Sequence, residues 1–142
     1  AGLAQLAEAL DRARRDLVPY LEAARAAGRR VAGYGAPGRA ITFLNALEIG
    51  PELLPFVVDR AAAKQGRTIP GVRIPIVAPE VLTADPPDEV LILTWNLLAE
   101  VRAALAPLVA GGTQLLVAIP SLADVTEEGG GASVAEVGTS VR

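Results

Sequence analysis

Leucine recurs at helical spacing along the first 27 residues. The leucines lie three, four or seven positions apart, at Leu3, Leu6, Leu10, Leu17 and Leu21. This spacing is typical of one face of an amphipathic helix. Because Pro19 lacks a backbone N–H, we expect a break or kink near Val18 and a second helix from Pro19 to Ala27. Gly28 then occupies the position of a helix C-cap glycine.

From Arg30 onward, short apolar runs alternate with helical stretches. The expected strands are "RVAGYG", "LPFVVD", residues 74–77, "EVLILTW" and "QLLVAIP". We expect a helix from Pro37 capped by Gly50, a short one at "APEVLTAD", and a third at 96–112. In the third, Asn96 is the expected N-cap and Pro107 distorts the final turns. The stretch between the second and third strands is too short for a full helix.

This alternation predicts an α/β fold with a doubly wound, mostly parallel, Rossmann-like sheet of about five strands and an N-terminal helical segment. We expect three parts: a helical segment at 1–27, a Rossmann-like domain at 28–122 and a flexible tail at 123–142. The tail contains a triple glycine and small polar residues, with a weak strand pattern at "ASVAEVG". No internal repeat is present in the sequence.

Composition excludes several classes of function. The formal net charge is −3, so the chain has no basic field for nucleic acid. No apolar run approaches the roughly 20 residues that span a bilayer. We therefore expect a cytoplasmic domain that binds neither nucleic acid nor membrane. The sequence contains no cysteine, histidine or methionine. We therefore predict no metal site, and we expect a trimmed product or a fragment of a longer chain. We also predict no catalytic residue: Glu, Tyr or Lys can serve as bases, but no candidate pair is placed by spacing.

A glycine turn follows the first expected strand and opens the next helix. Glycines 33, 35 and 38 have the spacing G-x-G-x-x-G, which lets backbone N–H groups approach an anion. Arg39 adds a side chain able to contact phosphate. The alternative is a tight turn without a ligand. The candidate substrate-binding residues of this turn are Gly33, Tyr34, Gly35, Ala36, Pro37 and Arg39.

Further candidates follow the other strands. Asp59 ends the second strand, where dinucleotide-binding folds place a ribose-binding acid, although an N-cap is an equal alternative. Lys64 in the next loop is a candidate for binding phosphate or carboxylate, whereas Arg67 is expected to be a solvated charge. Trp95 and Asn96 end the clearest strand. Trp95 is expected to stack on a base or sugar or else to cover the core, and Asn96 to cap a helix, contact a ligand, or both.

Taken in order, "GYGAPGR", "DRAAAKQGRTIPGVRIPI", "LILTWNL" and "VAIPSL" give the chain a specific resemblance. They resemble the C-terminal domain of the S-adenosylmethionine-dependent C-methyltransferases that act on nucleotide-linked deoxysugars. The resemblance covers about residues 20–122. It is more specific than the glycine spacing, because several separate motifs recur in the expected order.

The resemblance implies a division of labour in a longer enzyme. Full-length members have an N-terminal zinc-binding region, a middle domain that binds S-adenosylmethionine, and this C-terminal domain. The enzyme deprotonates a carbon next to a keto group of a nucleotide-diphosphate sugar and methylates the enolate. The chain is then a substrate-binding part that lacks the zinc and S-adenosylmethionine domains, needs no cofactor itself and is inactive alone. Its expected partners are the sugar nucleotide and the remainder of the parent chain.

Several positions depart from the family motifs. The glycine turn stands in place of "GAPAKG", with Arg39 for the lysine. Ala40 and Ile41 replace a usual glycine and a frequent asparagine, which we expect to make the loop less able to approach a ligand. Asp59, Lys64, Gln65 and Gly66 match "DxxxxKQG". The pair Trp95–Asn96 matches "PWN", with Thr94 for the proline.

Two other classes of function stay open on the sequence. The first is a self-standing module that binds NAD or a similar nucleotide, which the glycine turn and Asp59 allow. The second is an interaction domain with an empty glycine turn, in which the leucine-striped first helix packs on a partner or on a second copy in a homodimer.

Overall fold

A computed structural model describes residues 2–119 and 122–127 of the 142-residue chain. Its centre is a six-stranded sheet in the order β3-β2-β1-β4-β5-β6. The strands are β1 (Val31–Tyr34), β2 (Val57–Val58), β3 (Ile76–Val77), β4 (Glu89–Ile92), β5 (Gln114–Val117) and β6 (Ala123–Asp124). The first five are parallel, and β6 runs antiparallel to β5. The order 3-2-1-4-5 is that of a doubly wound Rossmann-like sheet, which confirms the predicted fold class.

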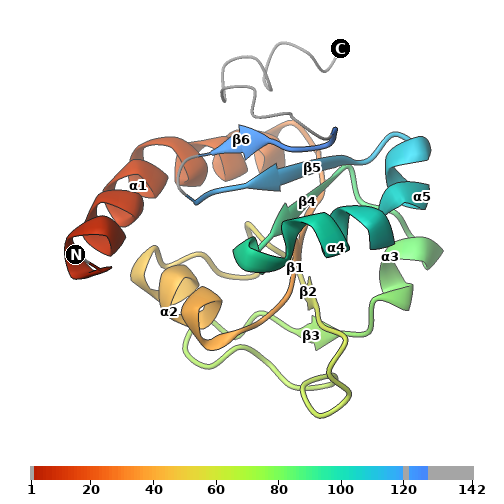
Figure 1. Ribbon diagram of the computed structural model, residues 1–142, viewed down its shortest axis with the longest axis horizontal. Coiled ribbons are helices and arrows are strands. Elements are labelled where there is room, and N and C mark those ends of the chain that lie inside the picture. The colour runs from red at the N-terminus through yellow and green to blue at the C-terminus, as the bar shows by residue number, and fades with distance from the viewer. Residues whose placement is uncertain (1, 120–121, 128–142) are drawn as a thin grey trace.

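Helices cover both faces of this sheet (Figure 1). Helices α1 (Gly2–Ala26) and α2 (Gly38–Ala46) pack on one face, together with the buried side chains of Val31, Leu91 and Leu116. Helices α3 (Glu80–Ala84), α4 (Leu98–Ala104) and α5 (Ala106–Ala110) pack on the other face, over Ala32, Val90 and Leu115. Every residue of β1 and β4 is buried, as expected for apolar runs in the middle of a parallel sheet.

Helix α1 is continuous, so the expected break near Val18 is wrong. Pro19 lies inside the helix on its exposed side. Leu17 and Leu21 on the opposite side are fully buried in the core. Packing of this apolar stripe therefore holds the helix together across the missing hydrogen bond. The expected cap at Gly28 is confirmed: its φ is +78°, and the N–H of Arg29 bonds to the carbonyl oxygen of Ala24 at 2.9 Å.

Two other helix boundaries differ from the prediction. Helix α2 ends at Ala46, and Glu48 rather than Gly50 adopts the left-handed conformation, with a φ of +55°. The N–H of Ile49 then bonds to the carbonyl of Leu44, and the buried Ile49 side chain anchors this turn. The expected helix at 96–112 is divided into η1 (Trp95–Leu97), α4 and α5. The break precedes Pro107, as predicted, because proline cannot donate its N–H to the preceding turn.

Strand β6 lies within the range expected to form a flexible tail. Its pairing is reinforced by Val125, whose N–H bonds to the carbonyl oxygen of Leu115 at 2.8 Å, and by Thr126, whose hydroxyl accepts the N–H of Leu115. Residues 123–126 thus pair with β5, and the flexibility of the tail stays a prediction. The weak strand pattern at "ASVAEVG" lies outside the described residues, and the division at residue 28 stays a prediction. No helix in the described ranges is long and apolar enough to cross a membrane.

A buried carboxylate joins α1 to the amino end of β4. Glu89 is 1% exposed and accepts a hydrogen bond from the hydroxyl of Tyr20. Arg29 places its Nε 3.5 Å from the Glu89 carboxylate and its guanidinium over the Tyr20 ring. Burial and the hydrogen bond to Glu89 raise the pKa of Tyr20 well above its usual value. The network fixes α1 on the sheet at the edge opposite the glycine turn.

Candidate functional site

The carboxyl ends of β1, β2 and β4 meet at one edge of the sheet. Strand β1 lies between β2 and β4, and the chain connections leave it in opposite directions. This is the topological switch point at which open α/β sheets bind ligands. The glycine turn follows β1, Asp59 follows β2, and Trp95 follows β4. The sequence motifs are therefore brought together at this edge.

Two glycines of the turn are required by packing. A Cβ on Gly33 would lie 2.8 Å from Cγ2 of Val57, which leaves no room for a larger residue. Gly35 has a φ of +96°, and a Cβ there would overlap with the side chain of Thr94. These two glycines thus let β1 pack closely against β2 and against the end of β4.

The third glycine has no such structural role. A Cβ on Gly38 would meet no atom within 4 Å, and Gly38 is exposed at the first position of α2. Pro37 precedes the helix, and no side chain caps its N-terminus. The first N–H groups of a helix have no partner within the helix, so those at Gly38 and Arg39 are available to an anion. The Arg39 side chain is exposed and forms no ion pair with any residue that the structure describes.

The substituted position Ala40 does not obstruct this helix terminus. Ala40 is fully buried, and its side chain belongs to the core between α2 and the sheet. The expectation that Ala40 and Ile41 make the loop less able to approach a ligand stays a prediction. Ile41 is half-buried and packs against the same core cluster.

A cavity of about 600 Å³ opens beside the α2 N-terminus. Its size falls within the usual range for small-molecule sites. The exposed first turns of α1 form one wall, and Figure 1 shows this end of α1 beside α2. Most of the lining is apolar, with Arg39 as the one charged residue among those that line it: Gln5, Leu6, Ala9, Gly38, Arg39, Thr42, Trp95 and Ile119.

Trp95 both covers the core and lines this cavity. Its ring meets that of Phe43 edge to face, with centroids 5.6 Å apart and an interplanar angle of 77°. Its indole Nε1 is buried and has no hydrogen-bond partner among the described residues. Asn96 is exposed within η1, and no side-chain cap precedes η1 or α4, so the expected N-cap at Asn96 is wrong.

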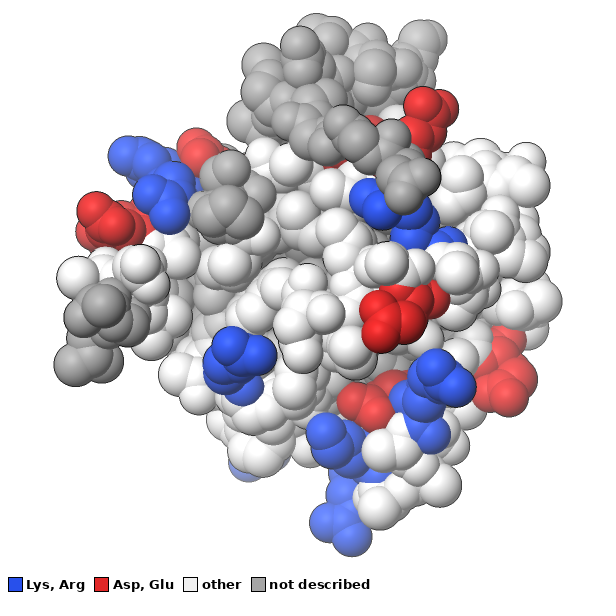
Figure 2. All heavy atoms as spheres, in the orientation of Figure 1, with Lys and Arg blue, Asp and Glu red and all other residues white. Residues whose placement is uncertain are grey.

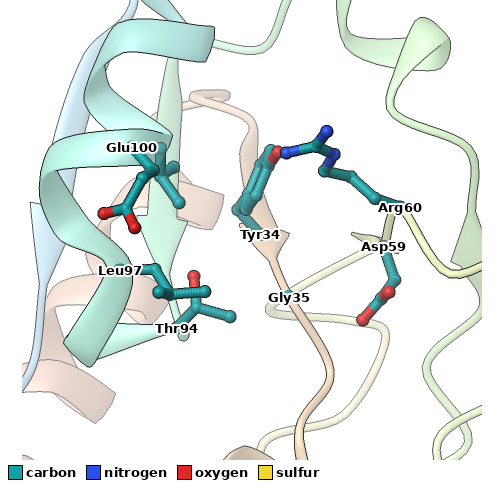
Figure 3. Close-up of a pocket in the computed structure, with 8 residues that line it drawn as sticks. Tyr34, Gly35, Asp59, Arg60, Thr94, Leu97 and Glu100 are labelled. Atoms are coloured by element: carbon teal, nitrogen blue, oxygen red, sulfur yellow. The ribbon is translucent and has the colours of Figure 1, made fainter.

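A smaller cavity, of about 170 Å³, lies at the same edge on the opposite face of the sheet. Figure 3 shows Tyr34 and Arg60 pointing toward one another on one side, with Thr94, Leu97 and Glu100 across from them. Burial raises the pKa of the Tyr34 hydroxyl above its usual value. Sequence reasoning did not select Arg60, although it lies in the "DRAAAKQG" motif beside Asp59, or Glu100, which lies inside the helix expected at 96–112.

Asp59 and Lys64 direct their polar atoms to the glycine turn. The Asp59 carboxylate accepts the N–H of Ala36 at 2.8 Å, and the Lys64 ammonium donates to the Ala36 carbonyl at 2.9 Å. In dinucleotide-binding folds, the acid at this position accepts ribose hydroxyls instead. Arg67 is exposed in the same loop, as expected.

On the face drawn in Figure 2, the described charged residues show no large field of one sign. In Figure 2, positive and negative side chains are interspersed, and the surface between α1 and α2 is mostly uncharged. Among residues 2–119 and 122–127, no three His, Cys, Asp or Glu side chains are grouped to hold a metal ion. Zinc therefore has no fitting site in the described part of the chain.

Comparison with known proteins identifies the family. Residues 1–120 match the sequence profile of the family described as the C-methyltransferase C-terminal domain. The chain belongs to this family. This C-methyltransferase C-terminal domain is also 34% identical over 116 residues to the C-methyltransferase NovU of Streptomyces niveus. The match covers 82% of the present chain and 28% of NovU, so the chain spans just over a quarter of that relative.

Several solved structures are similar to the present chain. One of them is UDP-D-quinovosamine 4-dehydrogenase from Vibrio fischeri, with 19% sequence identity and a TM-score of 0.49. The match covers 68% of the present chain and 93% of the dehydrogenase chain.

Proposed function

We propose that this domain holds the nucleotide-diphosphate sugar on which a parent C-methyltransferase acts. The observation that carries the proposal is the open N-terminus of α2, where Gly38 leaves the backbone accessible and Arg39 has no ion-pair partner among the described residues. Backbone N–H groups, the helix dipole and a guanidinium together suit a diphosphate.

The adjoining cavity suits the remainder of such a ligand. Trp95 offers an apolar ring and a buried indole N–H without a partner in the described ranges. A ring of this kind packs against a base or a deoxysugar. We therefore assign the diphosphate to the start of α2 and the nucleoside or the sugar to the cavity beside Trp95.

The chemical step belongs to the parent enzyme. S-adenosylmethionine, bound elsewhere in that enzyme, would supply the methyl group to the enolate of a keto sugar. The present chain would bind and orient the sugar nucleotide, and we expect it to bind without turnover when isolated. A self-standing NAD module has less support, because both carboxylate oxygens of Asp59 already accept backbone N–H groups, from Ala36 and Ala61.

Ligand titration tests this proposal directly. Trp95 is the single tryptophan of the sequence, so its fluorescence reports on the cavity. The 142-residue chain is titrated with thymidine-diphosphoglucose, NAD and S-adenosylmethionine, and heat is measured in parallel by calorimetry. Saturable binding of thymidine-diphosphoglucose alone is the expected result. Preferential binding of NAD, or no binding of any of the three, contradicts the proposal.

A charge-matched pair of variants locates the diphosphate. Arg39→Gln should raise the Kd for thymidine-diphosphoglucose roughly ten- to hundredfold, because it removes charge-assisted hydrogen bonds. Arg15→Gln makes the same change of charge at an exposed position of α1 and should leave the Kd unchanged. Equal effects of the two substitutions would mean that only the overall charge matters, and would exclude Arg39 as the phosphate contact.

A further inference from the structure

The "DRAAAKQG" segment folds back on the glycine turn. Asp59 Oδ2 accepts the N–H of Ala36 at 2.8 Å, and Lys64 Nζ donates to the carbonyl oxygen of Ala36 at 2.9 Å. The peptide groups on both sides of Ala36 are therefore held by side chains from the loop that follows β2. Lys64 Nζ also lies 3.8 Å from Asp59 Oδ2, so the two charges offset one another.

The groups that hold Ala36 are themselves fixed. Asp59 Oδ1 accepts the N–H of Ala61 at 2.8 Å, and its main-chain carbonyl accepts a bond from the Gln65 side chain at 2.8 Å. The Asp59 side chain is 14% exposed and that of Lys64 is 44% exposed. Each carboxylate oxygen of Asp59 thus already has a protein donor, and little of its surface faces solvent.

The glycine turn is constrained on its other sides as well. The N–H of Gly35 bonds to the carbonyl of Val58 at 2.7 Å, and Gly35 abuts Thr94. Ala36 is 1% exposed. Immediately beyond it, Pro37 and Gly38 are no longer enclosed, and α2 begins. The direction in which the first N–H groups of α2 point is consequently set by the backbone of Ala36.

We propose that Asp59 and Lys64 are positioning residues, which hold the peptide groups around Ala36 so that the α2 N-terminus and Arg39 face the ligand. They act without contacting the ligand themselves. This inference rests on the proposed function, because it concerns the same diphosphate site. The physical basis is preorganisation: a turn that already has its bound conformation loses less conformational entropy on binding.

Loss of this contact should weaken binding through the loop. Lys64→Met keeps most of the aliphatic stem and removes the donor to Ala36. If the competent loop conformation falls to about a tenth of the population, the apparent Kd rises about tenfold. Lys64→Arg restores a cationic donor and should recover most of the affinity. Arg67→Met is the matched control, because it removes one positive charge from the same loop at an exposed position.

Asp59→Asn gives a second test, in which the positioning role and simple electrostatics predict opposite changes in affinity. Asparagine has one carbonyl oxygen, so it cannot accept both the Ala36 and the Ala61 N–H groups, and its amide would face one of them. The positioning role predicts weaker binding of thymidine-diphosphoglucose. Removing a negative charge near an anionic ligand predicts, by electrostatics alone, tighter binding.

The experiment combines a readout without ligand and one with it. Amide hydrogen exchange of Ala36 is measured by NMR in the ligand-free 142-residue chain, and the Kd for thymidine-diphosphoglucose is measured from Trp95 fluorescence. In Lys64→Met and Asp59→Asn the ordered loop would be the minor state, so we expect the Ala36 amide to exchange at close to the rate of an unprotected amide and the Kd to rise about tenfold. In Arg67→Met we expect both the exchange rate and the Kd to stay unchanged. Far-UV circular dichroism checks that each variant is folded.

Each other outcome is decisive. Unchanged exchange in Lys64→Met overturns the inference, and if affinity still falls, Lys64 contacts the ligand directly. Faster exchange with an unchanged Kd, or tighter binding by Asp59→Asn, also overturns it. A wild-type chain that does not bind thymidine-diphosphoglucose refutes the proposed function instead, and the positioning role in binding with it. Exchange at Ala36, which needs no ligand, still decides whether Asp59 and Lys64 order the turn.

Discussion

Substitution of two glycines from the same turn should give opposite results. Gly35→Ala introduces a Cβ that overlaps with Cγ2 of Thr94 and lies 3.3 Å from its Cβ, at a residue whose φ is +96°. Overpacking costs about 1–3 kcal/mol, and a sparsely populated backbone conformation costs about 1–3 kcal/mol more. The free energy of unfolding should therefore fall by about 2–6 kcal/mol, a large share of the roughly 5–15 kcal/mol of a typical domain.

Gly38→Ala is the matched control. Its Cβ meets no atom within 4 Å, and the residue begins a helix. Alanine at a compatible position stabilises by up to about 1 kcal/mol, chiefly by restricting the unfolded chain. The free energy of unfolding of both variants is measured by urea denaturation, followed by Trp95 fluorescence and far-UV circular dichroism.

Removal of the opposing side chain separates the two costs of Gly35→Ala. Thr94→Ala deletes Cγ2 together with a buried hydroxyl that has no partner in the described part of the chain. In a double-mutant cycle, Thr94→Ala should remove the part of the Gly35→Ala destabilisation that comes from the steric overlap, which appears as a coupling free energy of about 1–3 kcal/mol. The part that comes from the strained backbone of residue 35 should remain. The reasoning is refuted if Gly35→Ala is as stable as Gly38→Ala, or if the coupling is below about 0.5 kcal/mol.

Two further predictions concern α1 and are measured by urea denaturation. Tyr20→Phe removes the donor to buried Glu89 and should lower the free energy of unfolding by about 1.5–3 kcal/mol. Burial and this hydrogen bond raise the pKa of Tyr20 above 10.0, so the stabilisation of the native protein over Tyr20→Phe is complete below pH 10. Above pH 10 this stabilisation is lost by about 1.4 kcal/mol per pH unit. A stability difference between the two proteins that stays constant above pH 10 contradicts this reasoning. Pro19→Ala should raise the free energy of unfolding by about 1–3 kcal/mol, because it restores an N–H donor to the Arg15 carbonyl inside a continuous helix, and a less stable variant would show that the proline is not strained there.

The parallel strands follow from the sequence because each is an apolar run in a position buried on both faces. The segment "EVLILTW" is the clearest case, since every residue of β4 is buried. Strand β6 has no such run: Ala123 and Asp124 pair with β5 because Val125 and Thr126 bond to Leu115. Those bonds depend on the folded position of β5, so no local pattern predicts them.

Local rules also failed where packing opposed them. Pro19 predicts a helix break, but α1 stays continuous because Leu17 and Leu21 are buried on the side away from the proline ring. Glycine adopts a positive φ more readily than other residues, so Gly50 was expected to end α2, yet Glu48 adopts the positive φ. The burial of Ile49 fixes where the chain turns. In both cases tertiary contacts outweigh a preference of about 1–3 kcal/mol.

The sequence predicted the edge at which the candidate site lies but not how its polar atoms are used. Strand ends of a parallel sheet share an edge, so the glycine turn, Asp59 and Trp95, each of which follows an expected strand, meet there. That Asp59 and Lys64 bond to Ala36 depends on the path of the loop after β2. Neither the spacing of the motif nor its charges predict the path of this loop.

The two edges of the sheet use their charges differently, and this difference favours one edge for binding. At the amino edge, Glu89 is enclosed by Tyr20 and Arg29, and the Arg30 N–H bonds to Asp88 at 2.7 Å. Charges there are offset within the protein, so an added anion would displace existing contacts at a cost in free energy. At the carboxyl edge, Asp59 and Lys64 offset one another, whereas the described residues provide no counter-charge for Arg39 or the α2 N-terminus.

An anion at the carboxyl edge therefore adds interactions without breaking any. It follows that stability and affinity should separate between the edges. Tyr20→Phe should lower the free energy of unfolding and leave the Kd for thymidine-diphosphoglucose unchanged. Arg39→Gln should leave the free energy of unfolding unchanged and raise that Kd. Measured on the same two variants, this crossed pattern distinguishes a binding edge from a structural one, because a general loss of order would change both quantities in both variants.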